Sequence, residues 1–253
     1  MKSFHALKGE MLKMRDYKAE TSERVKFIQY VIKSAKASGI VYGNSGGKDS
    51  ALVGILCKMA CENTVGVIMP CASKRNYESD KQDAETKAAL FGIATRTVDL
   101  TDVRGGLVRA IEGETALNDA AVTNIAPRLR MTALYAIAAA ENRLVAGTSN
   151  RSEAYMGYFT KFGDGACDFN PIADLTVTEI YEFLAHLNAP AEIIEKTPSG
   201  GLFEGQTDEG EMGITYAAID EFLLHGNTSA DDRAIIDRYH STSEHKRKMP
   251  LTI

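Results

Sequence analysis

A glycine-rich stretch at residues 43–51, GNSGGKDSA, holds the side chains with the clearest chemical potential. It nearly matches the phosphate-binding loop G-x-x-x-x-G-K-[ST] that is typical of kinases and GTPases. Two fixed positions of that motif differ, because Tyr42 replaces its first glycine and Asp49 replaces its final Ser or Thr. The sequence therefore argues against a kinase-type loop and for another way of holding phosphate.

The stretch retains the chemistry of an anion site. Gly46 and Gly47 allow the backbone to turn tightly and approach a ligand, and a helix that starts near Asp49 would point free N–H groups at an anion. The hydroxyls of Ser45 and Ser50 can add donors. A carboxylate beside phosphates makes sense only with a cation between them, and Mg²⁺ suits oxygen ligands of this kind. The alternative is a plain glycine turn in which Asp49 caps the helix.

Alternating strand and helix patterns predict the scaffold that positions this loop. Short apolar runs predict strands at residues 40–42, 64–69, 95–100 and 143–147. Capping residues predict a first helix that starts at Thr21 or Ser22 and a later one that starts at the capping box Thr176-x-x-Glu179. Amphipathic patterns predict further helices at residues 49–59, 80–91, 101–112, 129–142, 216–225 and 229–239. We expect residues 1–253 to form one α/β domain, a doubly wound, Rossmann-like parallel sheet with helices on both faces and helical C-terminal additions.

Sheets of this class bind ligands at the carboxyl ends of their strands. Residues 43–50, 70–76 and 148–153 fall at such ends. Residues 155–169, rich in glycine and aromatic side chains, are expected to form a loop. Residues 197–213 are too many for a plain connector and form either a mobile lid or a disordered surface loop, two alternatives that composition leaves open.

The overall composition narrows the class of protein. The chain has 253 residues and a net charge of −5, so nucleic acid is not an expected partner. Its apolar runs are too short for a membrane span or a signal peptide, so we expect a cytoplasmic protein with no membrane partner. The four cysteines form no C-x-x-C pair, and Cys57 and Cys61 are expected in the core rather than on a metal.

Six segments of the chain carry a resemblance to a known family. SGGKDS, residues 45–50, resembles the S-G-G-x-D-S loop of N-type ATP pyrophosphatases, which cleave ATP between its α- and β-phosphates. The other five resemble segments of ammonia-dependent NAD synthetases in the same order: NIAPRLRM (124–131), GTSNRSE (147–153), GYFTKFGDGACD (157–168), PSGGLFEGQTDEGEMGITYAAID (198–220) and HKRKMP (245–250). Nothing resembles a glutaminase domain, so ammonia is the expected nitrogen donor.

The resemblance implies an enzyme that uses ATP to join ammonia to deamido-NAD, giving NAD, AMP and pyrophosphate through an acyl adenylate. It implies that Asp49 and Glu153 hold Mg²⁺ and that Asp49 and Lys48 are catalytic. The implied ATP-binding residues are Gly43, Asn44, Ser45, Gly46, Gly47, Lys48, Asp49, Ser50, Met69, Thr148 and Ser199, and the implied deamido-NAD-binding residues are Arg128, Lys161, Asp168, His245 and Lys246.

The family also implies a homodimer with deamido-NAD lying across its interface. The helix expected at residues 129–142 is a candidate contact. A helix buried within a monomer would have the same apolar content, so the sequence does not separate the two cases.

Two positions depart from the family pattern. Val177 stands where the family usually has a lysine that contacts an ATP phosphate, and Ser199 stands where a threonine is common. Lys48 meanwhile occupies a variable position of the loop, where an uncharged residue is frequent. Our hypothesis is that Lys48 partly substitutes for the missing charge, the alternative being that it points to solvent.

Two other functions compete with this interpretation. One is another enzyme of the same loop class, which amidates or thiolates a different acid or a tRNA base. The other is a nucleotide-binding sensor without turnover, which would be expected to lose Asp49 or Glu153, and both are present.

Overall fold

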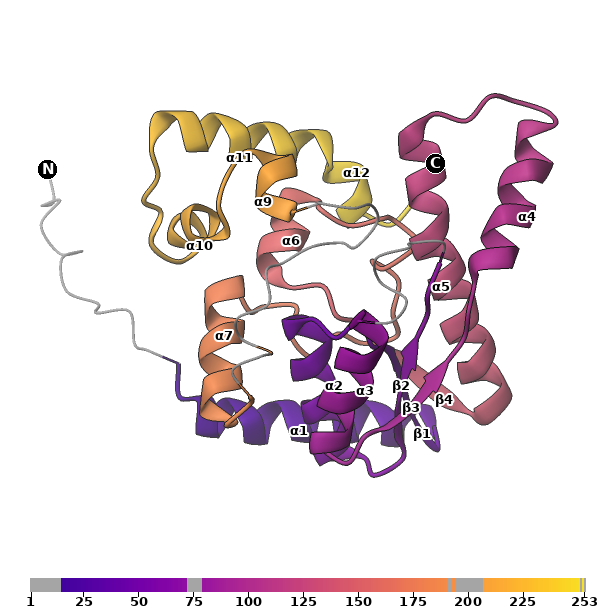
Figure 1. Ribbon diagram of the computed structural model, residues 1–253. Helices are drawn as coiled ribbons and strands as arrows, with labels where there is room; N and C mark the ends of the chain where they lie inside the picture. The colour runs from indigo at the N-terminus through magenta and orange to yellow at the C-terminus, as the bar shows by residue number, and fades with distance from the viewer. Residues whose placement is uncertain (1–14, 72–78, 191–192, 194–206, 251, 253) are drawn as a thin grey trace, which may run out of the picture.

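A parallel sheet forms the centre of the computed structural model, which describes residues 15–71, 79–190, 193, 207–250 and 252 (Figure 1). Its four strands are β1 (Gly39–Gly43), β2 (Thr64–Ile68), β3 (Ala94–Thr97) and β4 (Arg143–Ala146), in the order β3-β2-β1-β4. In register, Val41 of β1 lies beside Val65 on one side and Val145 on the other. The chain therefore builds outward from β1 in one direction and then returns to its other side, which makes the space between β1 and β4 the topological switch point.

Helices cover both faces of the sheet, as the strand residues require. Ile40 and Tyr42 point to one face and Val41 to the other, because side chains alternate along a strand. The first face is packed by α1 (Tyr17–Ala35), α2 (Lys48–Ala60), α3 (Ser79–Leu90) and α7 (Val177–His186), and the second by α5 (Asp119–Glu141), with α4 (Thr101–Glu112) against α5. The predicted doubly wound α/β class is confirmed.

The C-terminal part is helical and has an apolar cluster of its own. It contains α9 (Asp208–Met212), α10 (Tyr216–His225), α11 (Ala230–Thr242) and α12 (Glu244–Arg247), which lie beside α6 (Arg151–Met156) in Figure 1. Met156, Val177, Tyr216 and Ile236 are buried together there. This cluster fixes the C-terminal helices against α6 and α7, next to the carboxyl end of the sheet.

Several predicted boundaries were wrong, mostly because a cap lay further upstream. Helix α1 begins at Tyr17 and not after Thr21 or Ser22, since Asp16 accepts hydrogen bonds from the backbone of its first turn. Helix α5 begins ten residues before the predicted start at residue 129, because Asn118 caps it and the helix runs through Pro127. Strand β3 stops at Thr97 rather than at residue 100.

Two predicted loops are partly helical. Helix α6 continues to Met156, into the segment expected to be a loop from residue 155. Within the predicted lid, α9 is a short helix capped by Thr207, whose hydroxyl accepts from the backbone of Gly210 at 3.2 Å. Residues 197–206 of that segment, and Ser199 among them, lie outside the described residues.

Arginine side chains tie α1 to the segment that leads into α7. Arg24 donates to the carbonyl of Pro171 and to both carboxylate oxygens of Asp174, at 2.7 and 2.8 Å. Arg15 donates to Glu179, which also closes the capping box of α7 with Thr176. These contacts set the start of α7, whose first turns face the C-terminal cluster. No helix of the described chain combines the length and the apolar character needed to cross a bilayer.

We predict that Gly54→Ala destabilises the protein although alanine favours helices. A methyl group at Gly54, inside α2, would overlap the hydroxyl of the buried Tyr42 and lie 2.7 Å from its Cζ. The expected loss is about 1–3 kcal/mol of unfolding free energy, measured by urea denaturation. The control is Gly106→Ala in α4, where the nearest atom would lie 4.0 Å away, and a gain of about 0.5–1 kcal/mol is expected. Equal effects of the two substitutions would contradict the packing around Tyr42.

Candidate active site

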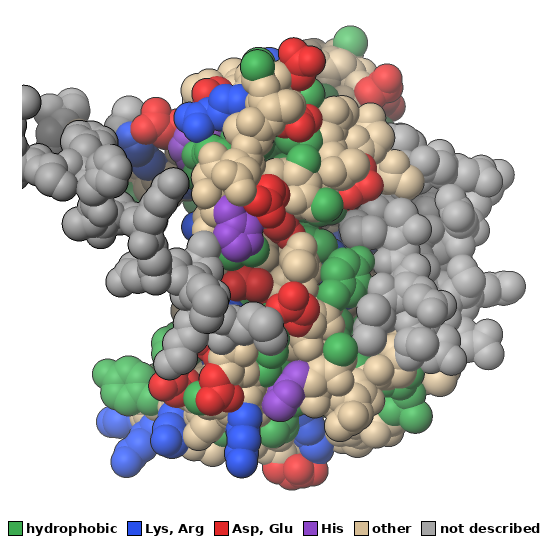
Figure 2. Space-filling model, turned by 90° about the vertical axis from the view of Figure 1, so that its left-hand side faces the viewer, with side chains coloured by type: hydrophobic (Ala, Val, Ile, Leu, Met, Phe, Trp, Pro, Cys, Tyr) green, Lys and Arg blue, Asp and Glu red, His purple; other side chains and the backbone are tan. Residues whose placement is uncertain are grey.

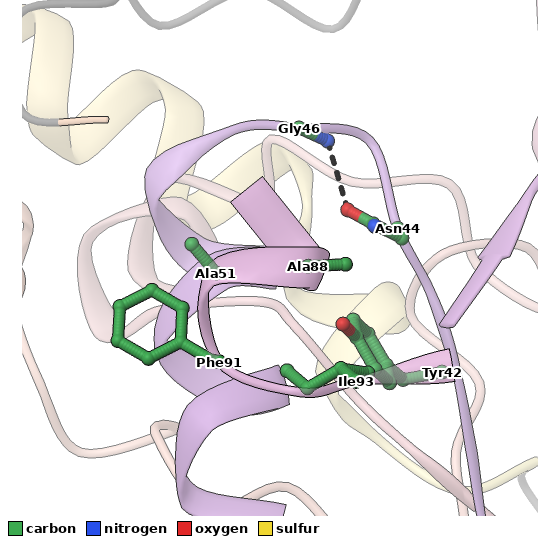
Figure 3. Close-up of a pocket in the computed structure, with 7 residues that line it drawn as sticks. All are labelled: Tyr42, Asn44, Gly46, Ala51, Ala88, Phe91 and Ile93. Carbon is green, nitrogen blue, oxygen red and sulfur yellow. Dashed lines mark hydrogen bonds between the residues drawn. The ribbon is translucent and has the colours of Figure 1, made fainter. Parts of the chain in front are cut away.

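The glycine-rich loop leaves β1 at Gly43 and is held in shape by one buried asparagine. The Asn44 side chain accepts from the backbone N–H of Gly46 at 3.1 Å and donates to the carbonyl of Ala84 in α3 at 3.1 Å. Gly46 has a φ of +70°, a conformation that glycine adopts without strain. Figure 3 shows this turn above a small pocket lined by Tyr42, Asn44, Gly46, Ala51, Ala88, Phe91 and Ile93. This pocket has no charged side chain in its lining, so the charged groups near the loop lie elsewhere.

Helix α2 begins at Lys48 with an N-terminus that no side chain caps. Gly47 is its N-cap residue, which shows that the alternative role of Asp49 as the cap was wrong. The hydroxyls of Ser45 and Ser50 lie 3.2 Å apart beside this terminus. Free N–H groups, the helix dipole and two hydroxyls together provide an anion site of the kind expected for phosphates.

A buried amide joins the two predicted carboxylates. Asn150, which has no exposed surface, donates from Nδ2 to Oδ1 of Asp49 at 3.0 Å. The same side chain accepts from the backbone of Glu153 at 2.9 Å, and Glu153 accepts in return from the backbone of Asn150 at 3.2 Å. This capping box begins α6 directly after β4, so the ends of β1 and β4 are linked across the switch point.

Lys48 turns inward to the same carboxylates. Its ammonium lies 2.8 Å from Oδ2 of Asp49 and only 4% of the residue is exposed, so the alternative that it points to solvent was wrong. The rings of Tyr216 and Tyr181 are 5.6 and 5.9 Å away. Burial alone would lower the pKa of Lys48, but the charges of Asp49 and Glu153 outweigh it and raise that pKa.

Val177, at the usual lysine position of α7, is 3% exposed and packs in the cluster that also contains Tyr216. The Lys48 ammonium therefore enters a space bordered by residues that pack around Val177. This placement favours the hypothesis that Lys48 supplies the charge that Val177 lacks. That Lys48 functionally replaces the missing lysine stays a prediction.

The carboxylate pair is suited to a divalent cation. Burial and the neighbouring charge of Asp49 raise the pKa of Glu153 well above its usual value, against the opposing charge of Lys48. Two carboxylates that destabilise each other in this way would be stabilised by a cation between them, and Mg²⁺ accepts one or two carboxylates together with phosphate oxygens. Within the described ranges, no three His, Cys, Asp or Glu side chains form a metal-binding group. The donor set thus fits an ion whose other ligands come from a nucleotide.

Other predicted ATP-binding residues lie at the same edge of the sheet. Met69 follows β2, is 7% exposed, and would be 3.6 Å from a methyl group placed on Gly43. Thr148 follows β4 and is partly exposed two residues before Asn150.

Four of the five residues predicted to bind deamido-NAD are brought together around α12. Arg128 donates to the carbonyl of Lys161 at 3.4 Å, and Lys161 donates to the carbonyls of His245 and Lys248 at 2.5 and 3.2 Å. Lys246 donates to the carbonyls of Gly157 and Phe159, at 2.8 and 2.9 Å. Burial, together with the charges of Arg128 and Arg247, lowers the pKa of Lys246. These cations are therefore held by backbone carbonyls near each other.

Asp168 has a different set of neighbours. It is exposed, its Oδ2 accepts from the backbone of Val145 in β4 at 2.7 Å, and its Oδ1 accepts from the hydroxyl of Tyr135 at 3.3 Å. It lies at the outer edge of β4, and none of its described hydrogen bonds joins it to the four residues around α12.

Sequence reasoning assigned no role to several residues of this site. Asn150 carried a signal, because Asn-x-x-Glu before a helix is a capping-box pattern that would have linked it to Glu153. Asp208 and Tyr216 lie in the segment 198–220 that carried the family resemblance, but it gave them no role: Asp208 is buried and accepts from the Tyr216 hydroxyl at 3.1 Å. Their proximity to Glu153 depends on how the C-terminal helices pack.

Comparison with known proteins agrees with this geometry. The family model described as NAD synthase matches residues 20–250. The NH(3)-dependent NAD(+) synthetase of Carboxydothermus hydrogenoformans is 44% identical over 93% of this chain and 97% of its own, and that of Archaeoglobus fulgidus is 43% identical over 88% and 92%. The chain belongs to the NAD synthase family, so the resemblance predicted from its motifs is confirmed.

Solved structures share the whole fold. The NMN synthetase of Francisella tularensis superposes with a TM-score of 0.89 at 38% identity, covering 94% of this chain and 99% of that one. The NH3-dependent NAD synthetase of Campylobacter jejuni superposes with a TM-score of 0.77 at 32% identity, with the same coverage.

We predict that Asn150→Asp slows ATP-dependent AMP release about tenfold or more, the effect of one charged contact. Aspartate caps a helix as well as asparagine does, but it would replace the donor to Asp49 with a third negative charge. Asn150→Ser is the matched variant, since serine keeps a capping oxygen but is too short to reach Asp49. Wild-type rates in both variants, with α6 intact by circular dichroism, would mean that Asn150 acts only as a cap.

Proposed function

We propose that this chain is an ammonia-dependent NAD synthetase that converts deamido-NAD, ATP and ammonia to NAD, AMP and pyrophosphate. The observation that carries the proposal is the Asp49–Asn150–Glu153 bridge beside the uncapped start of α2, at the switch point of the sheet. The curated relatives at 43–44% identity bear the name of this activity. A phosphate site with an adjacent carboxylate pair is suited to the first step of this reaction, in which ATP activates the substrate carboxylate.

The chemical difficulty is that a carboxylate is a poor electrophile. Attack of a nicotinate oxygen on the α-phosphate forms a C–O–P linkage and breaks the bond to the β-phosphate, so pyrophosphate leaves. Ammonia then attacks the acyl carbon, the C–N bond forms, AMP leaves and one proton is released. Activation by ATP thus replaces oxide with AMP as the leaving group.

In this reaction the loop stabilises the departing pyrophosphate. The N–H groups at the start of α2 and the hydroxyls of Ser45 and Ser50 would bind its oxygens, where negative charge increases as the bond breaks. Asp49 and Glu153 would hold Mg²⁺, which supplies further positive charge to the phosphates. Met69, Thr148 and Ser199 are proposed as the remaining ATP contacts.

Arg128, Lys161, His245 and Lys246 are proposed to bind the acidic dinucleotide, because cations suit its carboxylate and pyrophosphate. Asp168 is proposed to accept hydrogen bonds from ribose hydroxyls. Acidic side chains run down the middle of the face in Figure 2, and Lys and Arg gather toward its edges. With a net charge of −5, such a surface does not favour a nucleic-acid backbone as the bound polyanion.

A second candidate is the amidation of nicotinic acid mononucleotide to nicotinamide mononucleotide. It is favoured by one observation: the NMN synthetase of Francisella tularensis has the higher TM-score, 0.89 against 0.77 for the Campylobacter jejuni enzyme. Both substrates present the same nicotinate carboxylate, so the adenylation site described above serves either. They differ in whether an adenylate half must be bound.

We predict that NAD, AMP and pyrophosphate appear in equal amounts when the protein is incubated with deamido-NAD, ATP, Mg²⁺ and ammonium. Asp49→Asn should abolish all three products, because it removes one carboxylate of the pair. Incubation with equal concentrations of deamido-NAD and nicotinic acid mononucleotide then compares the two candidates by their product ratio. ATP binding without AMP release would contradict both and favour a sensor.

We further propose that the enzyme is a homodimer joined through α4 and α5, which lie together at the right of Figure 1. Helix α4 buries no residue, and Val103 and Leu107, one turn apart, are 53% and 39% exposed. In α5, only four of 23 residues are buried. An apolar face of this kind is suited to a second copy of the chain.

We predict that the double substitution Val103→Glu and Leu107→Glu shifts the protein from dimer to monomer in sedimentation velocity. Like charges on the two copies would face each other, and the apolar contact would be lost. Leu90→Glu, at a leucine on α3 that is 61% exposed, is the control and should leave the dimer intact. A dimer that survives the double substitution would place the interface elsewhere.

A further inference from the structure

Lys48 is placed where an ammonium group is doubly disfavoured. It is the first residue of α2, and positive charge is unfavourable at a helix N-terminus. It is also only 4% exposed, and a buried charge is costly unless it is paired. Something in the site must therefore compensate this charge.

The compensation comes from acidic groups of two separate elements, α2 and α6. The Lys48 ammonium is 2.8 Å from Oδ2 of Asp49 in α2, and the charge of Glu153 in α6 acts on it as well. Asp208, in α9, bonds to the hydroxyl of Tyr216, whose ring faces the ammonium at 5.6 Å. The ammonium thus occupies an Asp49 oxygen that a cation held by the carboxylate pair would need.

Both oxygens of Asp49 already have a donor from the chain. Asn150 donates to Oδ1 at 3.0 Å and Lys48 donates to Oδ2 at 2.8 Å. The Asn150 amide is fixed by the capping box of α6, whereas Lys48 carries its charge on a flexible four-carbon stem. Lys48 is therefore the partner that can leave Asp49 without disrupting the fold.

We propose that the Lys48 ammonium is the resident counter-ion of the Asp49–Glu153 pair in the substrate-free enzyme, and that it moves to a phosphate oxygen of ATP when a divalent cation takes its place. This inference rests on the proposed binding of ATP at the loop. Because the displaced ammonium needs an anion to receive it, the cation binds weakly alone and more tightly with the nucleotide. Lys48 so couples the binding of the metal ion to that of ATP.

The test uses Lys48→Met, which keeps the length and the apolar stem but removes the charge. We expect Mg²⁺ alone, titrated calorimetrically without nucleotide, to bind about tenfold more tightly than to wild type, the equivalent of one charged contact. We expect adenylation with Mg²⁺ and ATP to slow by about tenfold or more in the same variant. A structural defect would lower both the Mg²⁺ affinity and the adenylation rate. A higher Mg²⁺ affinity together with slower adenylation therefore distinguishes the proposed role from such a defect.

Two further variants act as controls. Lys58→Met removes a lysine from the same helix, where it pairs with the exposed Glu62, and should change neither measurement. Lys48→Arg keeps the charge and should keep the weak binding of Mg²⁺ alone. If Lys48→Met folds only when Mg²⁺ is added, the proposal is supported, and if Mg²⁺ does not restore its fold, the proposal is overturned.

Unchanged Mg²⁺ affinity in Lys48→Met would overturn the counter-ion role, even with wild-type formation of NAD. The calorimetric titration contains no deamido-NAD and no ATP. A chain that made no NAD would therefore still report on Lys48, so failure of this inference and failure of the proposed function are distinguishable.

Discussion

The site depends on a single buried amide between two strand ends. The peptide scaffold alone places β1 and β4 side by side, but it does not fix the loop that follows either strand. The Asn150 side chain does so, because it bonds to Asp49 on one loop and to the backbone of Glu153 on the other. Two acidic groups that repel each other are thereby held near one another before any ligand arrives, which is the pre-organisation that charge stabilisation requires.

A second buried polar group extends this order to the C-terminal helices. Asp220 of α10 accepts from the Ser152 hydroxyl of α6 at 2.5 Å through one oxygen. Its other oxygen accepts from the backbone and from the hydroxyl of Thr178 in α7, both at 2.7 Å. One carboxylate therefore joins three helices beside the site. Since Ser152 precedes Glu153 and Tyr216 shares a helix with Asp220, the acidic pair and the aromatic wall around Lys48 are positioned by the same contact.

The sequence predicted the features that depend on local patterns and short motifs. Strand and helix alternation gave the sheet class, and the glycine loop and Glu153 were recognised from short motifs. Boundaries failed where a cap overrode the apolar pattern: the helix that contains Pro127 was expected to begin after it, yet Asn118 starts it much earlier. The wall formed by Tyr181 and Tyr216 was beyond the sequence, because it depends on the packing of α7 and α10 against each other.

The two halves of the site differ in how their charges are satisfied. At the start of α2, no side chain caps the helix, the Ser45 and Ser50 hydroxyls bond within the described chain only to each other and to the backbone of Gly47, and Lys48 pairs with Asp49. Around α12, Lys161 already donates to the backbone carbonyls of residues 245 and 248, and Lys246 to those of residues 157 and 159. An acidic dinucleotide that drew these ammonium groups away would loosen α12 from the loop after α6, while one that added to their contacts would tighten it. Because α6 also begins with Asn150 and Glu153, the position of the C-terminal helix and the geometry of the carboxylate pair are connected through the same short segment.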